Sequence, residues 1–252
     1  MTRSVLNNKG MTLVELLVAA VLLSLVLIGV YRIQRDVSKK ADRESNKAVL
    51  HKDITTAAQL MEKDIRSAGY GIPGNGIGIT EQSGNDQLAI LVNPDKKKVT
   101  VASDVNATDT RIVLESSSGV NGGDWVDLYS GTDHQVVKVL ELRKGLADTL
   151  VLDGSAGLDV AAGSYIGRAE QMRYFIGDDG GLYKNKKGKN VLLSENINTL
   201  DCAAFDKDGT ELGGSLSYAV SVRFTLSGSV GEGKAAYQSQ ENTQVYMRNA
   251  GN

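Results

Sequence analysis

Glu15 stands out among the side chains that could do chemistry, because it is a carboxylate inside a long apolar stretch. Residues 11–30 read MTLVELLVAAVLLSLVLIGV, and Glu15 is the one ionisable side chain in this run. A carboxylate at the centre of a membrane helix costs roughly 2.5–3.5 kcal/mol, and less near an end of the helix. In the first turn it also interacts favourably with the helix dipole. Glu15 is therefore expected either to cap this turn and reach the lipid headgroups, or to bind a cationic partner.

The remaining reactive side chains do not form a catalytic or metal-binding set. The single cysteine, Cys202, excludes an intramolecular disulfide, and the two histidines, His51 and His134, lie far apart in sequence. No G-x-S-x-G, H-E-x-x-H or Walker sequence is present. Residues 206–211 read DKDGTE, which lacks the alternating acidic ligands of a calcium loop. We predict a solvated turn there, with a calcium site as the alternative, and no enzyme, cofactor or metal centre.

The apolar run itself predicts a membrane-spanning helix. Twenty helical residues extend about 30 Å, which matches the bilayer core, whereas a signal-peptide core has roughly 7–15 residues. Residues 32–47 are polar around the helix, and an apolar stripe at helical spacing then follows: Leu50, Ile54, Ala57, Met61, Ile65 and Ala68. We predict a transmembrane helix over 11–31 and its continuation over 32–68, the last part packing on a folded domain.

Residues 69–252 predict one β-rich globular domain. Glycine is frequent, with 28 residues, and short alternating segments are separated by Gly, Asp, Asn and Ser. The predicted strands are Gln87–Val92, Arg111–Glu115, Trp125–Tyr129, Gln135–Leu142, Thr149–Leu152, Glu170–Ile176, Val191–Leu193, Leu200–Phe205, Tyr218–Leu226 and Thr243–Arg248. The expected fold class is α+β, with a long amino-terminal helix packed on a mostly antiparallel sheet.

The string KGMTLVELLVAAVLLSLVLIGVYRIQ resembles the class III signal of type IV prepilins and of type II secretion pseudopilins. In that family a short charged leader ends in Gly, and a Glu stands five residues after the cut. The resemblance implies that residues 1–10 are a leader, that prepilin peptidase cleaves between Gly10 and Met11, and that the new amino terminus of Met11 is N-methylated. It also implies that the helix over 11–31 enters the core of a filament, and that Glu15 pairs with the terminal amine of a neighbouring subunit.

Several further segments resemble PilW-type minor pilins and, more distantly, GspJ-type minor pseudopilins: DIRSAGYG, LLSENINTLDCAAFDKDG, YAVSVRFTL and TQVYMRN. This resemblance implies a pilin-like fold and a non-enzymatic subunit that primes pilus assembly at the tip. The implied partners are prepilin peptidase, other minor pilins, the major pilin and the assembly platform protein. The implied location is the inner membrane, crossed once, with the carboxyl-terminal domain in the periplasm, and then the pilus.

Two other functions stay open, and nucleic-acid binding is disfavoured. The chain could be a minor pseudopilin of a type II secretion system, or a membrane-anchored periplasmic binding module that keeps residues 1–10 or is cut by ordinary signal peptidase. With 28 basic and 30 acidic residues, the net charge is −2, which provides no general field for DNA. Two lysine clusters, at 96–98 and 184–189, are predicted to be solvated hairpin turns, with a DNA grip as the alternative.

Overall fold

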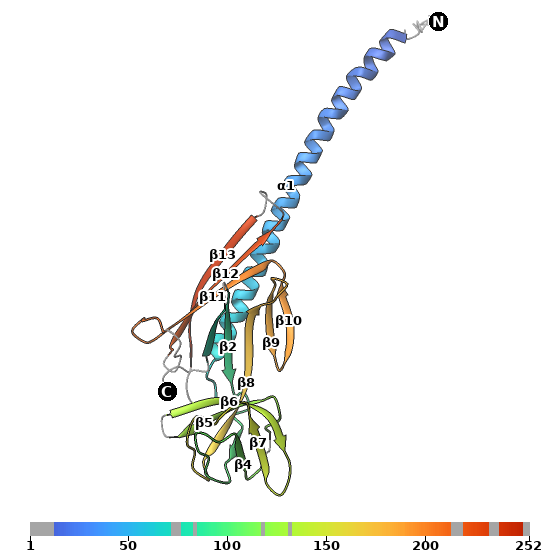
Figure 1. The fold of residues 1–252 in the computed structure, drawn as a ribbon. Helices are drawn as coiled ribbons and strands as arrows, with labels where there is room; N and C mark the ends of the chain where they lie inside the picture. Colours follow the sequence, from blue (N-terminus) through green and yellow to red (C-terminus); the bar gives the residue numbers. More distant parts are fainter. Residues whose placement is uncertain are drawn as a thin grey trace, which may run out of the picture. The chain divides into compact units, whose positions relative to one another are not determined.

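The structure, a computed structural model, describes residues 13–71, 77–82, 85–116, 119–130, 133–212, 219–231 and 237–248. Within them, one helix is followed by β-strands (Figure 1). The elements are α1 (Leu13–Ser67), β1 (Ile77–Gln82), β2 (Asn85–Val92), β3 (Lys98–Thr100), β4 (Arg111–Leu114), β5 (Trp125–Ser130), β6 (Asp133–Arg143), β7 (Asp148–Leu152), β8 (Tyr165–Ile176), β9 (Leu182–Lys186), β10 (Lys189–Ser194), β11 (Ile197–Phe205), β12 (Ser221–Val230) and β13 (Tyr237–Tyr246).

Backbone contacts divide the chain into two units, residues 1–48 and 49–252. In the first unit, the described residues belong to α1. Their side chains are exposed, apart from Lys47, which is half-buried. The second unit contains the remainder of α1 and all the strands, and the packed cores of the protein lie within it.

The strands of the second unit form two antiparallel sheets. In the larger sheet the order is β1-β2-β8-β5-β6-β7-β4, with β3 and the β9–β10 hairpin attached to β8. The smaller sheet has the order β11-β12-β13. All described strand pairs are antiparallel, as the sequence predicts. The fold class is therefore α+β, a long amino-terminal helix packed on antiparallel sheets.

The first core lies between the carboxyl-terminal part of α1 and the two sheets. The predicted stripe of Leu50, Ile54, Ala57, Met61, Ile65 and Ala68 is buried in full, which confirms this prediction. It packs with Leu88 and Ile90 of β2, Tyr174 of β8 and Phe224 of β12. The helix and β12 approach so closely that a Cβ added at Gly228 would lie 2.9 Å from Leu50 Cδ1.

The second core lies at the other end of β8, among strands β3 to β7. Its buried side chains are aliphatic and include Val126, Leu128 and Ile166. The even-numbered side chains of β8 share one face of the strand, because successive side chains alternate. Ile166 thus belongs to the second core, whereas Met172 and Tyr174 belong to the first. One strand therefore supports both cores.

Charged side chains separate the two cores on this face of β8. Arg168, whose side chain is 13 % exposed, lies 3.1 Å from Asp124, 3.4 Å from Glu170 and 3.9 Å from Asp95. Lys187 lies 3.0 Å from the same Glu170. These opposite charges compensate one another in a half-buried position, where a lone charge would be costly.

Each predicted strand is present, although its ends differ from the predicted ones, and the structure contains three strands that the sequence did not predict. Tyr218–Leu226 was predicted as a strand, but β12 begins at Ser221, and Tyr218 lies outside the described residues. The predicted alternation is confirmed at its centre, since Val222, Phe224 and Leu226 are buried and Arg223 is exposed. The three strands that the sequence analysis missed are β1, β3 and β9.

Candidate processing and assembly site

The candidate site is the amino-terminal part of α1 with the residues just before it. Glu15 lies in the first turn of α1, as the sequence predicts. Gly10 and Met11, the predicted cleavage and methylation positions, lie outside the described residues. Their predicted roles therefore rest on the sequence alone, whereas the structure describes Glu15, the carboxylate within the apolar run.

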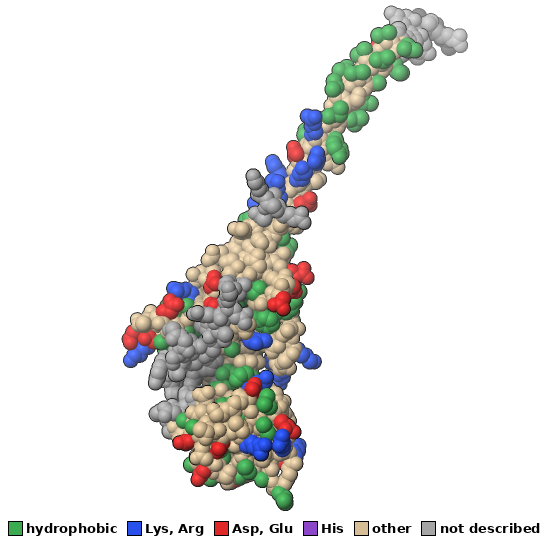
Figure 2. All heavy atoms as spheres, in the orientation of Figure 1, with side chains coloured by type: hydrophobic (Ala, Val, Ile, Leu, Met, Phe, Trp, Pro, Cys, Tyr) green, Lys and Arg blue, Asp and Glu red, His purple; other side chains and the backbone are tan. Residues whose placement is uncertain are grey.

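The first part of α1 is apolar around its whole circumference, which distinguishes it from an ordinary surface helix. From Leu13 to Val30, the large apolar side chains are 51–80 % exposed. Figure 2 shows them as an apolar surface at the amino-terminal end, followed by basic side chains. Mean hydropathy reaches 2.8 in this helix, which by length and composition could cross a membrane. Apolar surface of this extent is covered by lipid or by other apolar helices.

The polar residues in this stretch fit an apolar environment. The hydroxyl group of Ser24 contacts the carbonyl oxygens of Ala20 and Val21, at 2.7 and 3.0 Å, so its polarity is satisfied within the helix. At Gly29, an added Cβ would meet no atom within 4 Å. Glu15 is thus the charged group that this apolar segment presents to its surroundings.

The carboxyl-terminal part of α1 is held on the sheets by two buried or half-buried carboxylates. Asp53 and Asp64 are eleven residues apart, which is close to three helical turns, so both lie on the same face. Asp53 accepts hydrogen bonds from Ser194 Oγ at 2.8 Å and from Asn196 Nδ2 at 2.9 Å. Each carboxylate therefore ties the helix to the strand region that it packs against.

Asp64 contacts side chains from two strands, β8 and β9. The Tyr174 hydroxyl donates a hydrogen bond to Asp64 Oδ2 at 2.5 Å, and Lys184 Nζ contacts the same oxygen at 2.5 Å. Lys184 also lies over the Tyr174 ring, 5.5 Å from its centroid. Burial, together with the hydrogen bond to Asp64, raises the pKa of Tyr174 above its ordinary value, so the phenol remains a donor.

Sequence reasoning missed these attachments and misjudged Lys184. The cluster at 184–189 was predicted to be a solvated turn, but Lys184 lies in β9, and its side chain is 16 % exposed. The spacing of Asp53 and Asp64, which places both on one helical face beside the apolar stripe, could have indicated these attachments. The turn between β9 and β10 is formed by Lys187 and Gly188, as predicted.

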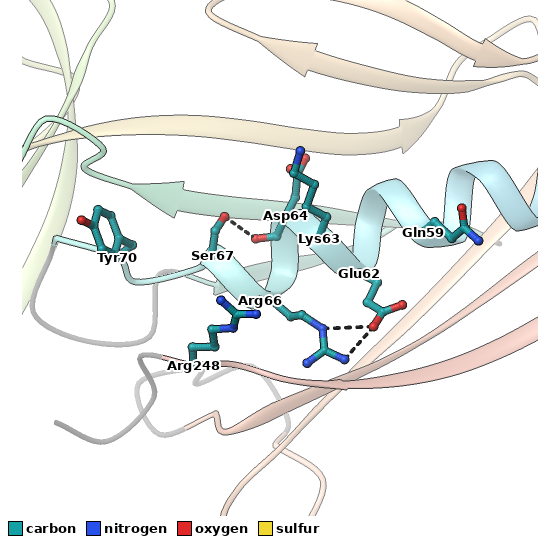
Figure 3. A pocket seen from close by; sticks show the side chains of 8 residues that line it. All are labelled: Gln59, Glu62, Lys63, Asp64, Arg66, Ser67, Tyr70 and Arg248. Carbon is teal, nitrogen blue, oxygen red and sulfur yellow. Dashed lines mark hydrogen bonds and ion pairs between the residues drawn. The ribbon is translucent and has the colours of Figure 1, made fainter.

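A hollow of about 670 Å³ lies beside the end of α1, and Figure 3 shows its lining. Its acidic groups are already engaged: Glu62 pairs with Arg66 at 2.6 Å, and Asp64 binds Tyr174 and Lys184. Arg248 comes from beyond β13. The hollow is therefore lined by structural ion pairs rather than by a converging acid, base and nucleophile.

The acidic segment at 206–211 and the single cysteine both have structural surroundings that the fold explains. Asp206 Oδ1 accepts hydrogen bonds from the amides of Asp208 and Thr210, at 2.9 and 2.8 Å, so this carboxylate closes a turn. Cys202 is half-buried against the first core, and burial raises the pKa of its thiol. Within the described part of the chain, no group of three His, Cys, Asp or Glu side chains could hold a metal ion.

The amino-terminal segment of the chain is similar to a known sequence motif, and the fold is weakly similar to a solved structure. The family model described as the prokaryotic N-terminal methylation motif matches residues 6–31. Among solved structures, a type IV-like pilin from Thermus thermophilus is similar, at 9 % identity and a TM-score of 0.42, over 80 % of this chain and 98 % of that one. No curated protein matches the chain. The protein thus carries the N-terminal methylation motif of prokaryotic prepilin-like proteins at the start of a long helix, whose later part packs on antiparallel sheets.

Proposed function

We propose that this protein is a minor, tip or priming subunit of a type IV pilus. The observation that carries the proposal is the match of residues 6–31 to the N-terminal methylation motif. That segment contains the end of the charged leader, the apolar start of α1 and Glu15. The resemblance of the β domain to PilW-type minor pilins supports the assignment to a minor rather than a major subunit.

Maturation would begin with proteolysis at the end of the leader. Gly10 has no side chain to obstruct approach to the scissile bond between Gly10 and Met11. Cleavage removes Arg3 and Lys9, so the net side-chain charge changes from −2 to −2 − 2 = −4. It also creates a terminal amine on Met11, which the peptidase would methylate. The amine stands four residues before Glu15, at the same end of the helix.

Assembly would bury the apolar segment of α1 among the helices of neighbouring subunits. In that low-dielectric bundle, an ion pair between Glu15 and a neighbour's terminal amine is strong, and an unpaired carboxylate is costly. The pair would therefore set the axial register of an entering subunit. The exposed apolar surface and Glu15 would thus act together when the subunit enters the filament.

The implied partners are prepilin peptidase, the other minor pilins, the major pilin and the assembly platform protein. The protein would wait in the inner membrane, with its β domain in the periplasm, before it enters the pilus. A minor pseudopilin of a type II secretion system is the alternative, because both machines use the same amino-terminal motif. The genes adjacent to this one distinguish the two.

Intact mass and amino-terminal sequence of the protein from its native membrane test the proposal. We expect a chain that starts at N-methylated Met11. A chain that still starts at Met1, in cells with active prepilin peptidase, would overturn the proposal. It would favour a membrane-anchored periplasmic binding module instead, which either keeps its first ten residues or is cut by ordinary signal peptidase.

Substitution of Gly10 tests the cleavage position directly. We expect Gly10→Leu to block processing, because the branched side chain obstructs the scissile bond. Gly29→Leu is the matched control, since the same substitution falls within α1, where an added Cβ meets no atom within 4 Å. Electrophoretic mobility reports the leader, and a shortened product from Gly10→Leu would contradict the assignment.

A further inference from the structure

Strand β13 is an edge strand of the three-stranded sheet. The order of that sheet is β11-β12-β13, and among the described strands β13 pairs with β12 alone. Figure 1 shows it running along the outer side of β12. The ladder between these two strands covers Tyr237 to Tyr246, so the other side of β13 offers up to ten residues of backbone.

The direction of the backbone groups of β13 follows from one hydrogen bond just past its end. The amide of Met247 donates to the carbonyl of Val220 at 2.9 Å, which continues the ladder beyond Ser221 and Tyr246. Hydrogen-bonded and non-hydrogen-bonded pairs alternate in antiparallel sheets. Odd-numbered residues of β13 therefore direct their N–H and C=O groups to β12. Even-numbered residues, from Gln238 to Tyr246, direct theirs away from it.

Within its described residues, β13 itself lacks several features that usually prevent further strand pairing. Edge strands are commonly protected by lysine, proline, a bulge or very short length. Residues 237–246 read YQSQENTQVY, with Glu241 as the one charged side chain and no proline. The ten-residue register with β12 contains no bulge. This strand is therefore long, regular and almost uncharged.

A polar groove lies on the face of this sheet, across β11, β12 and β13. Its volume is about 450 Å³, and its lining consists of uncharged residues. Thr199 of β11, Ser227 and Ser229 of β12, and Gln238 and Gln240 of β13 contribute hydroxyl and amide groups. Gln238 and Gln240 belong both to the groove and to the outward-directed backbone positions. A chain that pairs with β13 would therefore place side chains near the groove.

We propose that the outer edge of β13, with this groove, binds an extended polypeptide segment with uncharged polar side chains by antiparallel strand addition. The donors and acceptors on the edge repeat every second residue, about 6.8 Å apart, which is the repeat of another strand. Main-chain hydrogen bonds supply affinity in this type of recognition, and side-chain pockets supply specificity. The surface is remote in sequence from the processing site and does not depend on the pilus assignment.

The sequence of β13 itself provides a suitable probe peptide. In an antiparallel pair, the outward even residues of β13 would form the hydrogen-bonded pairs with residues of the added strand. Centring the pair on Asn242 places Asn242 opposite Asn242 and Gln240 opposite Gln244, and it places Glu241 opposite Thr243 rather than opposite a second Glu241. The decapeptide YQSQENTQVY therefore combines matching amide side chains with no like-charge pair.

The test measures binding of this fluorescent decapeptide to the full chain in detergent micelles, by anisotropy, and protection of backbone amides, by hydrogen exchange. We expect binding to slow the exchange of even-numbered amides between 238 and 246. We expect Gln240→Pro to weaken binding about tenfold or more, because the proline ring removes an outward N–H and blocks approach of the added strand. Gln240→Ala, which keeps that N–H, should bind within about threefold of the unchanged protein.

Three outcomes would overturn the proposal. One is the absence of binding at millimolar peptide, and another is protection confined to a different part of the chain. The third is equal binding by Gln240→Pro, which would assign the interaction to side chains rather than to the strand edge. Circular dichroism and thermal melting verify that Gln240→Pro is folded. Asn242→Pro replaces it if it is not, because its N–H has the same outward direction.

Discussion

At the scale of single residues, Glu15 is the clearest test of the proposed assembly step. It is a carboxylate in the first turn of an exposed apolar helix. We expect Glu15→Ala to leave leader cleavage intact and to reduce the number of pili about tenfold or more, because removing one partner of a buried ion pair is costly. Immunoblotting measures cleavage, and electron microscopy of sheared pili measures assembly.

A matched control for Glu15 lies on the polar part of the same helix. Glu44 is exposed and pairs with Lys47 at 3.0 Å, three residues away. Surface pairs of this kind contribute little to stability, so Glu44→Ala should assemble normally. Normal pilus numbers in both variants would refute the role of Glu15, whereas equal loss in both would indicate a general effect of charge on the helix.

Asp127 is a second residue with a measurable effect, because it makes the stability of the fold depend on pH. It lies in β5 with an exposed fraction of 0 %, and burial raises its pKa from 3.8 to about 7. The folded state thus retains a proton that the unfolded chain loses near pH 4. Stability contributed by this group is present below about pH 4 and is lost as the pH rises towards 7.

We therefore expect Asp127→Asn to stabilise the protein at pH 8 by roughly 2–4 kcal/mol and to have little effect at pH 4, because one pKa unit corresponds to about 1.4 kcal/mol. Denaturant unfolding of both proteins at several pH values gives this difference. Asp153→Asn is the control, since that exposed carboxylate lies 4.0 Å from Lys138. A stabilisation that does not change with pH would disprove the account.

At the scale of elements, the Asp64 cluster determines how firmly α1 is held on β8 and β9. We expect Asp64→Ala to destabilise the second unit by about 3–5 kcal/mol, because it leaves the half-buried Lys184 and the hydroxyl of the buried Tyr174 without their acceptor. Tyr174→Phe should cost less, about 1.5–3 kcal/mol, because it removes one hydrogen bond to a charged group and leaves the ion pair. Thermal and denaturant unfolding provide the comparison.

The exposed pair of Tyr183 and Asp179 is the control for this cluster. Its hydrogen bond is also 2.5 Å long, but both side chains are in contact with solvent. We expect Tyr183→Phe to change stability much less than Tyr174→Phe. If both changes had the same effect, the length of the hydrogen bond rather than its burial would determine its contribution, contrary to the argument above.

Local patterns predicted the elements whose signals are regular, and missed those whose signals are mixed. The apolar stripe from Leu50 to Ala68 predicted both the helix and its buried face, because helical spacing is visible in one segment. Strand β9 was missed because LYKNK carries two lysines, and the partner of Lys184 lies 120 residues away. Strand β3 has three residues, too few for a periodic pattern.

In the candidate site, too, the continuous motif could be predicted, whereas contacts between residues far apart in sequence could not. The motif from Gly10 to Glu15 is continuous in sequence, so its chemistry could be predicted from sequence alone. The attachments of Asp53 and Asp64 depend on strands far along the chain, and their acceptor roles required the fold. The pairing of β2 with β8 likewise joins residues more than 70 positions apart, for which no local pattern exists.

At the scale of the whole molecule, the sheet order shows how the second core is connected to the first. Strands β2 and β8 are antiparallel neighbours, and Val92 lies opposite Glu170. The residues between them, 93–169, include every buried side chain of the second core. The segment leaves the first core after β2 and returns to it along β8. The second core is thus an insertion within what would otherwise be a simple hairpin.

This arrangement gives the two cores different evolutionary freedom. A turn of two or three residues could join β2 to the later half of β8 without breaking a pair in the β1-β2-β8-β9 part of the sheet. The buried stripe of α1 and the strands that cover it therefore do not depend on the length of the inserted segment. Asn93, which is buried and hydrogen-bonded to Tyr70 and Gly71 after α1, marks where the supporting part ends. Replacement of the residues beyond Asn93, up to β8, offers a modular route to new surfaces on the same helix and strands.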